Sequence, residues 1–472
     1  MKFALVTLGC DKNTVDSERY LAQLLDHGAV RVHDVEEAEL IVVNTCGFID
    51  AAKAESIDAI VQATRLKVDG AAQAVVAVGC MVERHRDELA AAIPEVDLFL
   101  GASEMDQLVP RLRERGLIGD PVTQHPGVRI YAGDTAHVRY LKISEGCDHG
   151  CAFCAIPLMR GRHRSFSLDD LVREAQLLEL QGAREVSLVA QDLAHYGRDR
   201  RDGVRLPELL EALVHETSIS WFRNLYLYSA GITPRLLEVI AREPRILRYL
   251  DMPIQHASDA MLERMRRPER KRTIREKVAR FRDAVPGLAI RTTCIVGFPG
   301  ETDDDFAELL EFLEEMRFER VGAFTYSAQD GTHAAQLADD VPEGVKRDRL
   351  ERLTERQRAI TAERYESRVG SRVRALVERR AEIAGEGRAA AAVQGRTGAV
   401  ARLPWQADDI DGVTWLDADA AAGAFVEVEV TDVVDDYDFR AHVLSVVDAP
   451  APAPRTARSR VLPLATVGSY GR

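Results

Sequence analysis

The sequence predicts an α/β protein in three parts: an N-terminal open parallel α/β sheet, a central incomplete (β/α)6 barrel and a small C-terminal antiparallel β-barrel. Apolar runs alternate with helical segments over residues 1–120, and six further strand–helix units follow within residues 133–366. Such alternation implies parallel strands. Residues 367–447 instead carry short strands with few helical segments, which is typical of a small antiparallel barrel.

Three apolar runs in the first part each end at a cysteine. Residues 3–8 precede Cys10, residues 40–43 precede Cys46 and residues 74–78 precede Cys80. Predicted helices follow at residues 15–25, 51–66 and 81–92. Because parallel strands end along one edge of a sheet, the three thiols are expected to meet there. This predicts a three-cysteine metal centre with a free coordination position; the alternative is three unrelated core cysteines.

The central part contains six apolar segments that alternate with helices. The predicted strands cover residues 138–144, 185–190, 222–228, 249–254, 289–296 and 320–326, and the predicted helices cover residues 168–180, 206–214, 234–241, 257–265 and 303–316. Six such units give a parallel sheet that is curled but open on one side. Ligands in this fold bind at the C-terminal ends of the strands.

A tight cysteine loop follows the first of these strands. Cys147, Cys151 and Cys154 are close enough in sequence to bind one metal centre. Three thiolates leave one iron of a cubane cluster without a protein ligand, whereas structural zinc usually takes four protein ligands. An incomplete zinc knuckle is the alternative, but no fourth Cys or His follows at zinc-finger spacing.

Other polar residues are predicted at the same rim. Gln191 and Asp192 follow the second strand, and Gln255 and His256 follow the fourth. The turn at residues 297–302 has glycines that allow close backbone approach to a ligand. We expect His256 to be a structural histidine and the seventh cysteine, Cys294, to be a core thiol. Arg291 is expected either to bind a ligand carboxylate or to form a structural ion pair.

The last part is acidic. A charged helix over residues 343–366 leads to predicted strands at residues 373–377, 397–403, 413–416, 425–430 and 442–447. Between residues 403 and 447 there are eleven acidic residues against one basic residue, Arg440. Such charge would attract a basic protein and repel phosphates, unless it is only a generic solvated face. The Pro/Ala-rich tail, residues 448–472, is predicted to be disordered.

The overall composition limits the function classes. With 62 Lys and Arg against 76 Asp and Glu, the net charge of −14 opposes a broad grip on nucleic acid. No uncharged apolar stretch reaches the ~18 residues of a membrane span, and the first apolar run is too short for a signal peptide. We therefore expect no membrane partner and a cytoplasmic, reducing location, in which thiols bind metals rather than form bridges.

These motifs together resemble the methylthiotransferases of the radical S-adenosylmethionine (SAM) superfamily. The resemblance rests on residues 8–10, 44–50 and 78–80, the Cys147 loop and residues 297–302, and it runs to about residue 447, where the barrel resembles a TRAM domain. It implies two [4Fe–4S] clusters, on Cys10, Cys46 and Cys80 and on Cys147, Cys151 and Cys154. It also implies SAM, with Phe153 beside the adenine. Gln255 and Arg291 are predicted SAM contacts, and no catalytic residue beyond the cluster ligands is predicted.

Two branches of that family compete. One modifies a tRNA adenosine next to the anticodon, and the other modifies the β-carbon of an aspartate in ribosomal protein uS12. Residues 12–18, 46–50 and 157–161 resemble the ribosomal branch, as do residues 411–413 and 431–438 of the barrel. Asp148 and Gly150 depart from the usual pattern of the cysteine loop. The expected partners are uS12 or the small ribosomal subunit, an electron donor and a sulfur source, with tRNA unlikely; a non-catalytic cluster carrier is a third class.

Overall fold

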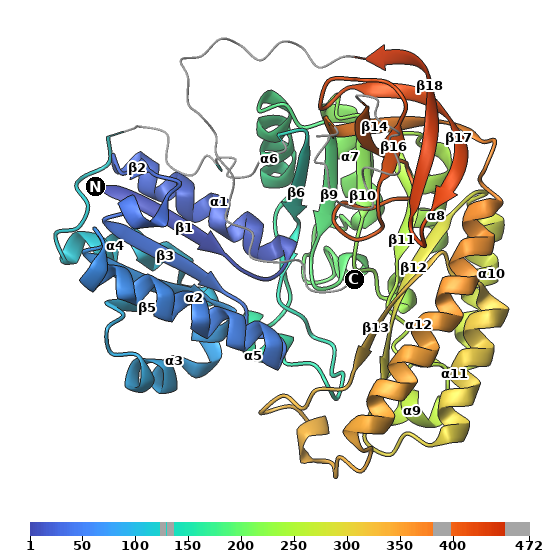
Figure 1. Ribbon diagram of the computed structural model, residues 1–472, viewed down its shortest axis with the longest axis horizontal. Helices are drawn as coiled ribbons and strands as arrows, with labels where there is room; N and C mark the ends of the chain where they lie inside the picture. Colours follow the sequence, from blue (N-terminus) through green and yellow to red (C-terminus); the bar gives the residue numbers. More distant parts are fainter. Residues whose placement is uncertain (123–128, 130–135, 381–397, 449–472) are drawn as a thin grey trace.

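The computed structural model describes residues 1–122, 129, 136–380 and 398–448. Two parallel sheets lie side by side in it, and a closed barrel caps one end of the second sheet (Figure 1). The predicted disorder of residues 449–472 and most of the predicted linker at residues 120–127 lie outside the described residues. Within the described ranges, no helix is both long and apolar enough to cross a membrane.

The N-terminal sheet has five parallel strands in the order β2-β1-β3-β4-β5. They are β1 Lys2–Thr7, β2 Val30–Arg31, β3 Leu40–Thr45, β4 Ala74–Gly79 and β5 Leu98–Gly101, and its helices are α1 Asp11–Asp26, α2 Asp50–Asp69, α3 Cys80–Ala92 and α4 Leu108–Glu114. Every residue of β3 and β4 is buried, as expected of strands covered on both faces. Thr7 pairs with Asn44, and Thr45 pairs with Gly79. The three central strands therefore end at one level.

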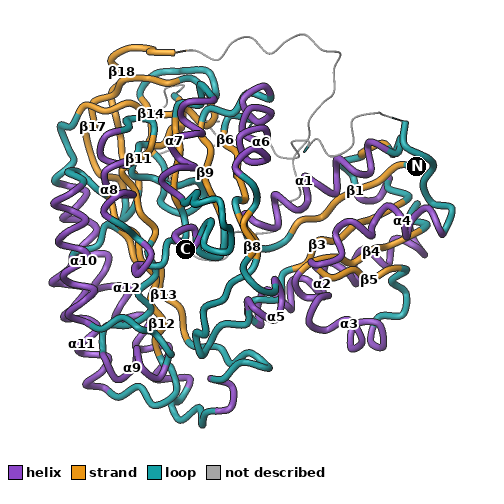
Figure 2. The backbone as a smooth tube through the Cα atoms, turned by 180° about the vertical axis from the view of Figure 1, so that it is seen from behind, coloured by secondary structure: helices purple, strands orange, loops and turns teal. Residues whose placement is uncertain are grey.

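The central sheet has six parallel strands in the order β13-β12-β11-β10-β9-β6. They are β6 Val138–Lys142, β9 Glu185–Val189, β10 Trp221–Asn224, β11 Ile246–Asp251, β12 Ala289–Val296 and β13 Arg320–Thr325. The covering helices are α6 Leu168–Leu180, α7 Leu206–Glu216, α8 Pro234–Arg242, α9 Asp259–Arg264, α10 Lys271–Ala284 and α11 Asp303–Met316. The sheet curls with its helices outside and leaves the side toward the N-terminal sheet open (Figures 1 and 2).

Short elements complete the fold, and three of them flank the cysteine loop. The hairpin strands β7 Ser144–Glu145 and β8 Arg164–Ser165 close the base of the loop, and helix α5 Ile156–Arg160 follows its last cysteine. The 3-10 helices are η1 Val35–Glu37, η2 Ala102–Gln107, η3 Leu193–His195, η4 Ser229–Gly231 and η5 Ala334–Gln336.

The C-terminal strands form a closed antiparallel-rich barrel in the order β14-β15-β16-β18-β17. They are β14 Arg372–Arg380, β15 Ala399–Arg402, β16 Thr414–Leu416, β17 Phe425–Val434 and β18 Asp438–Asp448, and helix α12 Glu343–Glu366 leads into them. The barrel shares a hydrophobic core with Val138, Trp221 and Ala289, which open their strands in the central sheet. It therefore packs at the end of that sheet away from the cysteine loop.

The acidic residues of the barrel do not form one solvated face. Asp411 is fully buried; it accepts a hydrogen bond of 2.6 Å from Tyr249 Oη and lies 3.3 Å from Arg320 Nε. Asp408 accepts a hydrogen bond of 3.2 Å from Tyr140 Oη. For these two carboxylates the predicted role in attracting a partner is wrong, because they dock the barrel onto the central sheet. Five acidic residues are exposed: Asp409, Asp417, Asp419, Asp432 and Asp435.

Candidate functional site

One cavity of about 460 Å³ lies between the two sheets, and the six predicted metal ligands all line it. Cys10, Cys46 and Cys80 follow β1, β3 and β4, whose C-terminal ends face the central sheet. Cys147, Cys151 and Cys154 enter from the loop after β6. Two sets of three thiols, one from each sheet, therefore line the same cavity. We call Cys10, Cys46 and Cys80 the first trio, and Cys147, Cys151 and Cys154 the second trio.

The first trio is brought together by the ends of its strands. Asn13 Nδ2 donates hydrogen bonds to Leu8 O at 2.7 Å and to Thr45 O at 3.1 Å, which ties the ends of β1 and β3. Burial, with the nearby Cys10 thiol, raises the pKa of Cys46 to about 11. Burial likewise raises the pKa of Cys80 to about 12; Cys10 and Cys46 add to the rise, and the Arg160 guanidinium opposes it. The three thiols therefore lie close together in the wall of one cavity.

The second trio is held by backbone hydrogen bonds of its loop. Cys147 N donates to Gly161 O at 3.1 Å, and Ala152 N donates to Met265 O at 2.9 Å. Burial raises the pKa of Cys147 to about 11, and Cys151 adds to the rise. Burial raises the pKa of Cys154 to about 12, with contributions from the two other thiols of the loop.

The donor set fits iron–sulfur clusters. Cysteines bind metals as thiolates, so metal binding at these buried thiols displaces their protons. Soft sulfur ligands are those that iron–sulfur clusters take, and each trio leaves one coordination position for another ligand. All seven cysteines are in the described part of the chain, and Cys294 is buried in the core of the central sheet, away from the cavity lining.

Two of the three residues predicted to contact SAM line the cavity, and the third does not. Phe153 and Gln255 line the cavity, whereas Arg291 is not among the lining residues. Arg291 Nη1 lies 3.0 Å from Asp251 Oδ1, and Arg291 Nε lies 3.8 Å from Asp411 Oδ1. Of the two roles expected for Arg291, the geometry gives it the structural ion pair. His256 is fully buried, and its Nε2 lies 3.4 Å from Glu301 Oε1.

Two side-chain amide oxygens in the cavity wall have no hydrogen-bond donor among the described residues. Gln255 has φ +70°, a left-handed backbone that is uncommon for residues other than glycine. Its side-chain Oε1 is buried and has no hydrogen-bond partner among the described residues. Gln191 Oε1 is also buried and has no hydrogen-bond partner among the residues that the structure describes. The Nε2 group of Gln191 donates a hydrogen bond of 3.2 Å to Glu145 Oε1. Because unmet buried acceptors are costly, these two oxygens point to a ligand with hydrogen-bond donors.

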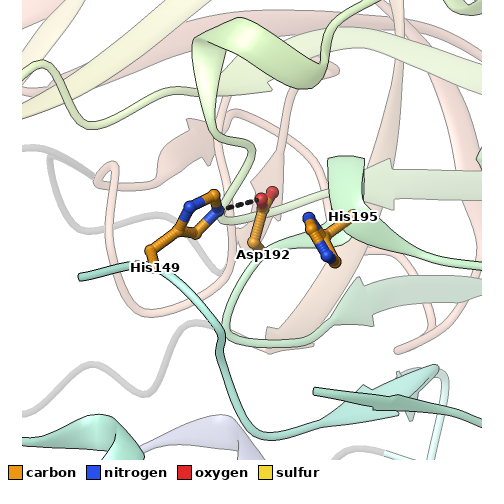
Figure 3. A group of neighbouring side chains, drawn as sticks. All are labelled: His149, Asp192 and His195. Atoms are coloured by element: carbon orange, nitrogen blue, oxygen red, sulfur yellow. Dashed lines mark hydrogen bonds and ion pairs between the residues drawn. The ribbon is translucent and has the colours of Figure 1, made fainter. Parts of the chain in front are cut away.

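A histidine that was not among the predicted site residues lies in the cavity wall. His149 Nε2 lies 2.8 Å from Asp192 Oδ2, and His195 lies on the other side of that carboxylate (Figure 3). Asp192 Oδ1 accepts hydrogen bonds from the backbone N–H groups of Ala194 and Tyr228, so the carboxylate is fixed. The His149 ring stacks on Tyr228 with centroids 4.2 Å apart. The position of His149 inside the cysteine loop was the signal that could have identified it.

Two arginines and a lysine complete the polar wall. Arg160, Arg267 and Lys12 line the cavity. Lys12 Nζ lies 3.4 Å from the centroid of the Tyr226 ring, and Tyr226 Oη donates a hydrogen bond of 3.1 Å to Asp11 Oδ2. The cavity thus combines sulfur ligands, amide acceptors and buried cations in its wall.

Comparisons with known proteins agree with this arrangement. Residues 2–101 match the family described as "Uncharacterized protein family UPF0004", and residues 141–313 match the radical SAM superfamily. The chain is 44% identical to the ribosomal protein uS12 methylthiotransferase RimO of Anaeromyxobacter sp. (strain K), over 97% of this chain and 96% of that protein. It is 39% identical to the protein of the same name from Geobacter sulfurreducens, over 94% of this chain and 99% of that one.

Solved structures share the fold. The radical SAM methyltransferase TsrM from Kitasatospora setae, with tryptophan and a SAM analogue bound, superposes with a TM-score of 0.50 at 14% identity. That match covers 68% of this chain and 72% of the other. At this identity the likeness establishes a shared fold over the matched part and no more.

Proposed function

The chain belongs to the family of ribosomal protein uS12 methylthiotransferases, and from that premise we propose that it adds a methylthio group to the β-carbon of an aspartate in uS12. The observation that carries the proposal is the single cavity that all six cysteines line. A reaction that joins sulfur to an unactivated carbon needs a radical source and a sulfur source in reach of one substrate atom. The shared chamber supplies that proximity.

The cofactors of the proposal are two [4Fe–4S] clusters and SAM. Cys147, Cys151 and Cys154 would hold the cluster that binds SAM, and Cys10, Cys46 and Cys80 would hold the cluster that carries sulfur. When bound, these groups supply the radical that removes hydrogen from the β-carbon, the sulfur that joins this carbon and the methyl group that completes the product. An external one-electron donor and a sulfur source are the further partners.

The residues of the chain would bind, orient and shield these groups. Gln255 Oε1 and Gln191 Oε1 offer hydrogen-bond acceptors for the ammonium or ribose hydroxyl groups of SAM. Phe153 offers an apolar ring in the same wall for the adenine. Apolar side chains such as Ile156 and Met159 line the cavity, limit the access of water and favour burial of the apolar parts of the bound groups.

Charge supports a basic protein as the partner. The chain carries a net charge of −14, and acidic residues such as Asp417, Asp432 and Asp435 are exposed on the barrel. An acidic surface accelerates the approach of a basic protein and repels phosphate backbones. The supporting surface is smaller than the sequence predicted, because Asp408 and Asp411 serve the barrel interface.

The test is the mass of uS12 isolated from a strain that lacks this gene. We expect uS12 to lack the mass of one methylthio group there and to regain it when the wild-type gene is restored. The Cys46→Ala variant should fail to restore it, whereas Cys294→Ala, which changes a buried thiol outside the cavity, should restore it. Full modification by Cys46→Ala would contradict the two-cluster assignment. A loss of methylthio-adenosine from tRNA, with uS12 unchanged, would favour the tRNA branch instead.

A further inference from the structure

Arg160 reaches from the central domain to a sulfur ligand of the N-terminal domain. It is the last residue of α5, and its Nε–H donates to Cys80 Sγ at 3.1 Å. Its side chain is only 3% exposed. A buried guanidinium with a donor aimed at a thiol sulfur is a directed interaction, because the energetic cost of burying the cation demands specific partners.

The remaining donors of Arg160 are anchored. Arg160 Nη1 lies 2.6 Å from Asp16 Oδ2 and 3.4 Å from Glu145 Oε2, and Nη2 donates to Asn13 Oδ1. Lys142 pairs with both of these carboxylates, so Arg160 belongs to a fixed network that joins the two domains. Because Nη1 and Nη2 bind these other partners, Nε–H is the donor that Arg160 directs at Cys80.

Arg267 makes a similar approach to the other trio. Its Nη1 lies 3.8 Å from Cys151 Sγ, while Nη2 donates to Pro253 O at 2.8 Å. The guanidinium lies over the Tyr228 ring, 4.0 Å from its centroid, and its Nε is 3.4 Å from Glu269 Oε2. The side chain is 4% exposed. Each cysteine trio therefore has one buried arginine directed at one of its sulfurs.

We propose that Arg160 and Arg267 set the reduction potentials of the two clusters separately, Arg160 through Cys80 and Arg267 through Cys151. A cubane cluster with three thiolate ligands is negatively charged, and it gains a second net negative charge when an external one-electron donor reduces it. A buried positive hydrogen-bond donor at a ligand sulfur stabilises the reduced form more than the oxidised form, which raises the potential. This proposal gives a role to Arg160, which lies in the motif of residues 157–161. The proposed function alone assigns no role to this side chain.

The inference rests on the proposed two-cluster function, and one experiment separates the two. The holoenzyme is reconstituted anaerobically, its iron is counted, and both clusters are titrated with a reductant while electron paramagnetic resonance is recorded. The signal that changes when SAM is added belongs to the Cys147 loop, and the other belongs to the first trio. Arg160→Met should lower only the potential of the first trio, and Arg267→Met should lower only that of the SAM-binding cluster. The expected size is at least about a tenfold change in the reduced-to-oxidised ratio, about 59 mV for one electron.

Two further variants make each outcome decisive. Arg349 is also buried and ion-paired, with Glu301 and Asp303, but does not line the cavity, so Arg349→Met should leave both potentials unchanged. If Arg160→Met loses iron, Arg160→Lys is titrated instead; it keeps a charge but has no Nε–H, and an unchanged potential there would overturn the hydrogen-bond role. Eight irons per chain with no selective shift would refute only the arginine inference. Four irons in the wild-type protein would refute the proposed function itself.

Discussion

Gly9 lies directly against Cys46: a Cβ atom added at Gly9 would be 2.8 Å from Cys46 Cβ and 3.0 Å from Cys46 Sγ. Gly9 also has φ +92°, a backbone that L side chains rarely adopt. The residue before the first cysteine of the chain therefore leaves the space that the second cysteine fills. The close approach explains why the first trio needs glycine at this position.

Replacing Gly9 by alanine should displace Cys46 and disrupt the first metal centre. We expect Gly9→Ala to lose about four of about eight irons per chain, because each cubane cluster holds four. Iron analysis with visible absorption measures this loss. Gly116 is the matched control, since it has φ +69° but no atom within 4 Å of an added Cβ. If Gly9→Ala bound as much iron as Gly116→Ala, the steric role of Gly9 would be refuted.

The sequence was sufficient to place the cysteines because their convergence follows from strand topology. Cys10, Cys46 and Cys80 each follow a buried parallel strand, and parallel strands of one sheet end at a common edge. Helix α10 was not predicted, because its Lys- and Arg-rich sequence buries only Ile274, Val278 and Phe281. The strand β2 was missed because it has only two residues.

Contacts between domains could not be predicted in the same way. Arg160 is 80 residues from Cys80 in the chain, and their contact depends on how the two sheets dock. The burial of Asp411 likewise depends on the docking of the barrel, which no local pattern of the sequence specifies. The sequence likewise allowed two roles for Arg291, because it does not specify that Asp251 lies beside the guanidinium.

Changing Gln255 to methionine should weaken SAM binding without removing iron. Methionine is similar in length but has no amide, so a ligand donor that Gln255 Oε1 accepts would lose its partner. A loss of about 1–2 kcal/mol corresponds to roughly 5- to 30-fold weaker affinity. Equilibrium binding of SAM to the reconstituted protein measures the change. Arg291→Lys, which keeps a cation near Asp251 outside the cavity lining, should bind SAM like the wild type. The opposite ranking of the two variants would restore Arg291 as the SAM contact.

The interface between the barrel and the central sheet should respond to pH through Asp408. Burial, with Glu378 and Asp409 nearby, raises the pKa of Asp408 to about 7, although Arg402 opposes the rise. Since this pKa exceeds the ordinary value of 3.8, folding takes up a proton, and the stability due to Asp408 falls as pH rises from about 4 to about 7.

Asp408→Asn removes this titration and should raise the midpoint of thermal unfolding at pH 8. The asparagine resembles the protonated carboxyl, so the variant should be more stable than wild type above pH 7 by about 1–2 kcal/mol, with the difference shrinking toward pH 5.5. Thermal unfolding followed by circular dichroism across this range is the measurement. A wild-type advantage that grows with pH would instead show that the ionised Asp408 carboxylate stabilises the fold.

The acidic residues of the barrel should separate into two groups when their charges are removed one at a time. Asp411 accepts hydrogen bonds from Tyr249 Oη at 2.6 Å and from Ala407 N at 3.0 Å and lies beside Arg320, so Asp411→Asn leaves a buried cation poorly compensated. We expect a loss of about 3 kcal/mol in the free energy of unfolding, measured with urea.

Asp435→Asn is the matched substitution on the exposed side. Asp435 has φ +54°, which asparagine tolerates, so its stability should change by less than about 0.5 kcal/mol. If the exposed acidic residues attract uS12, this variant should associate with uS12 more slowly at low ionic strength and equally fast at high ionic strength, because screening removes the steering. Stopped-flow association at two salt concentrations gives both rates. A slower rate that is independent of salt would mean that Asp435 contributes a direct contact rather than long-range attraction.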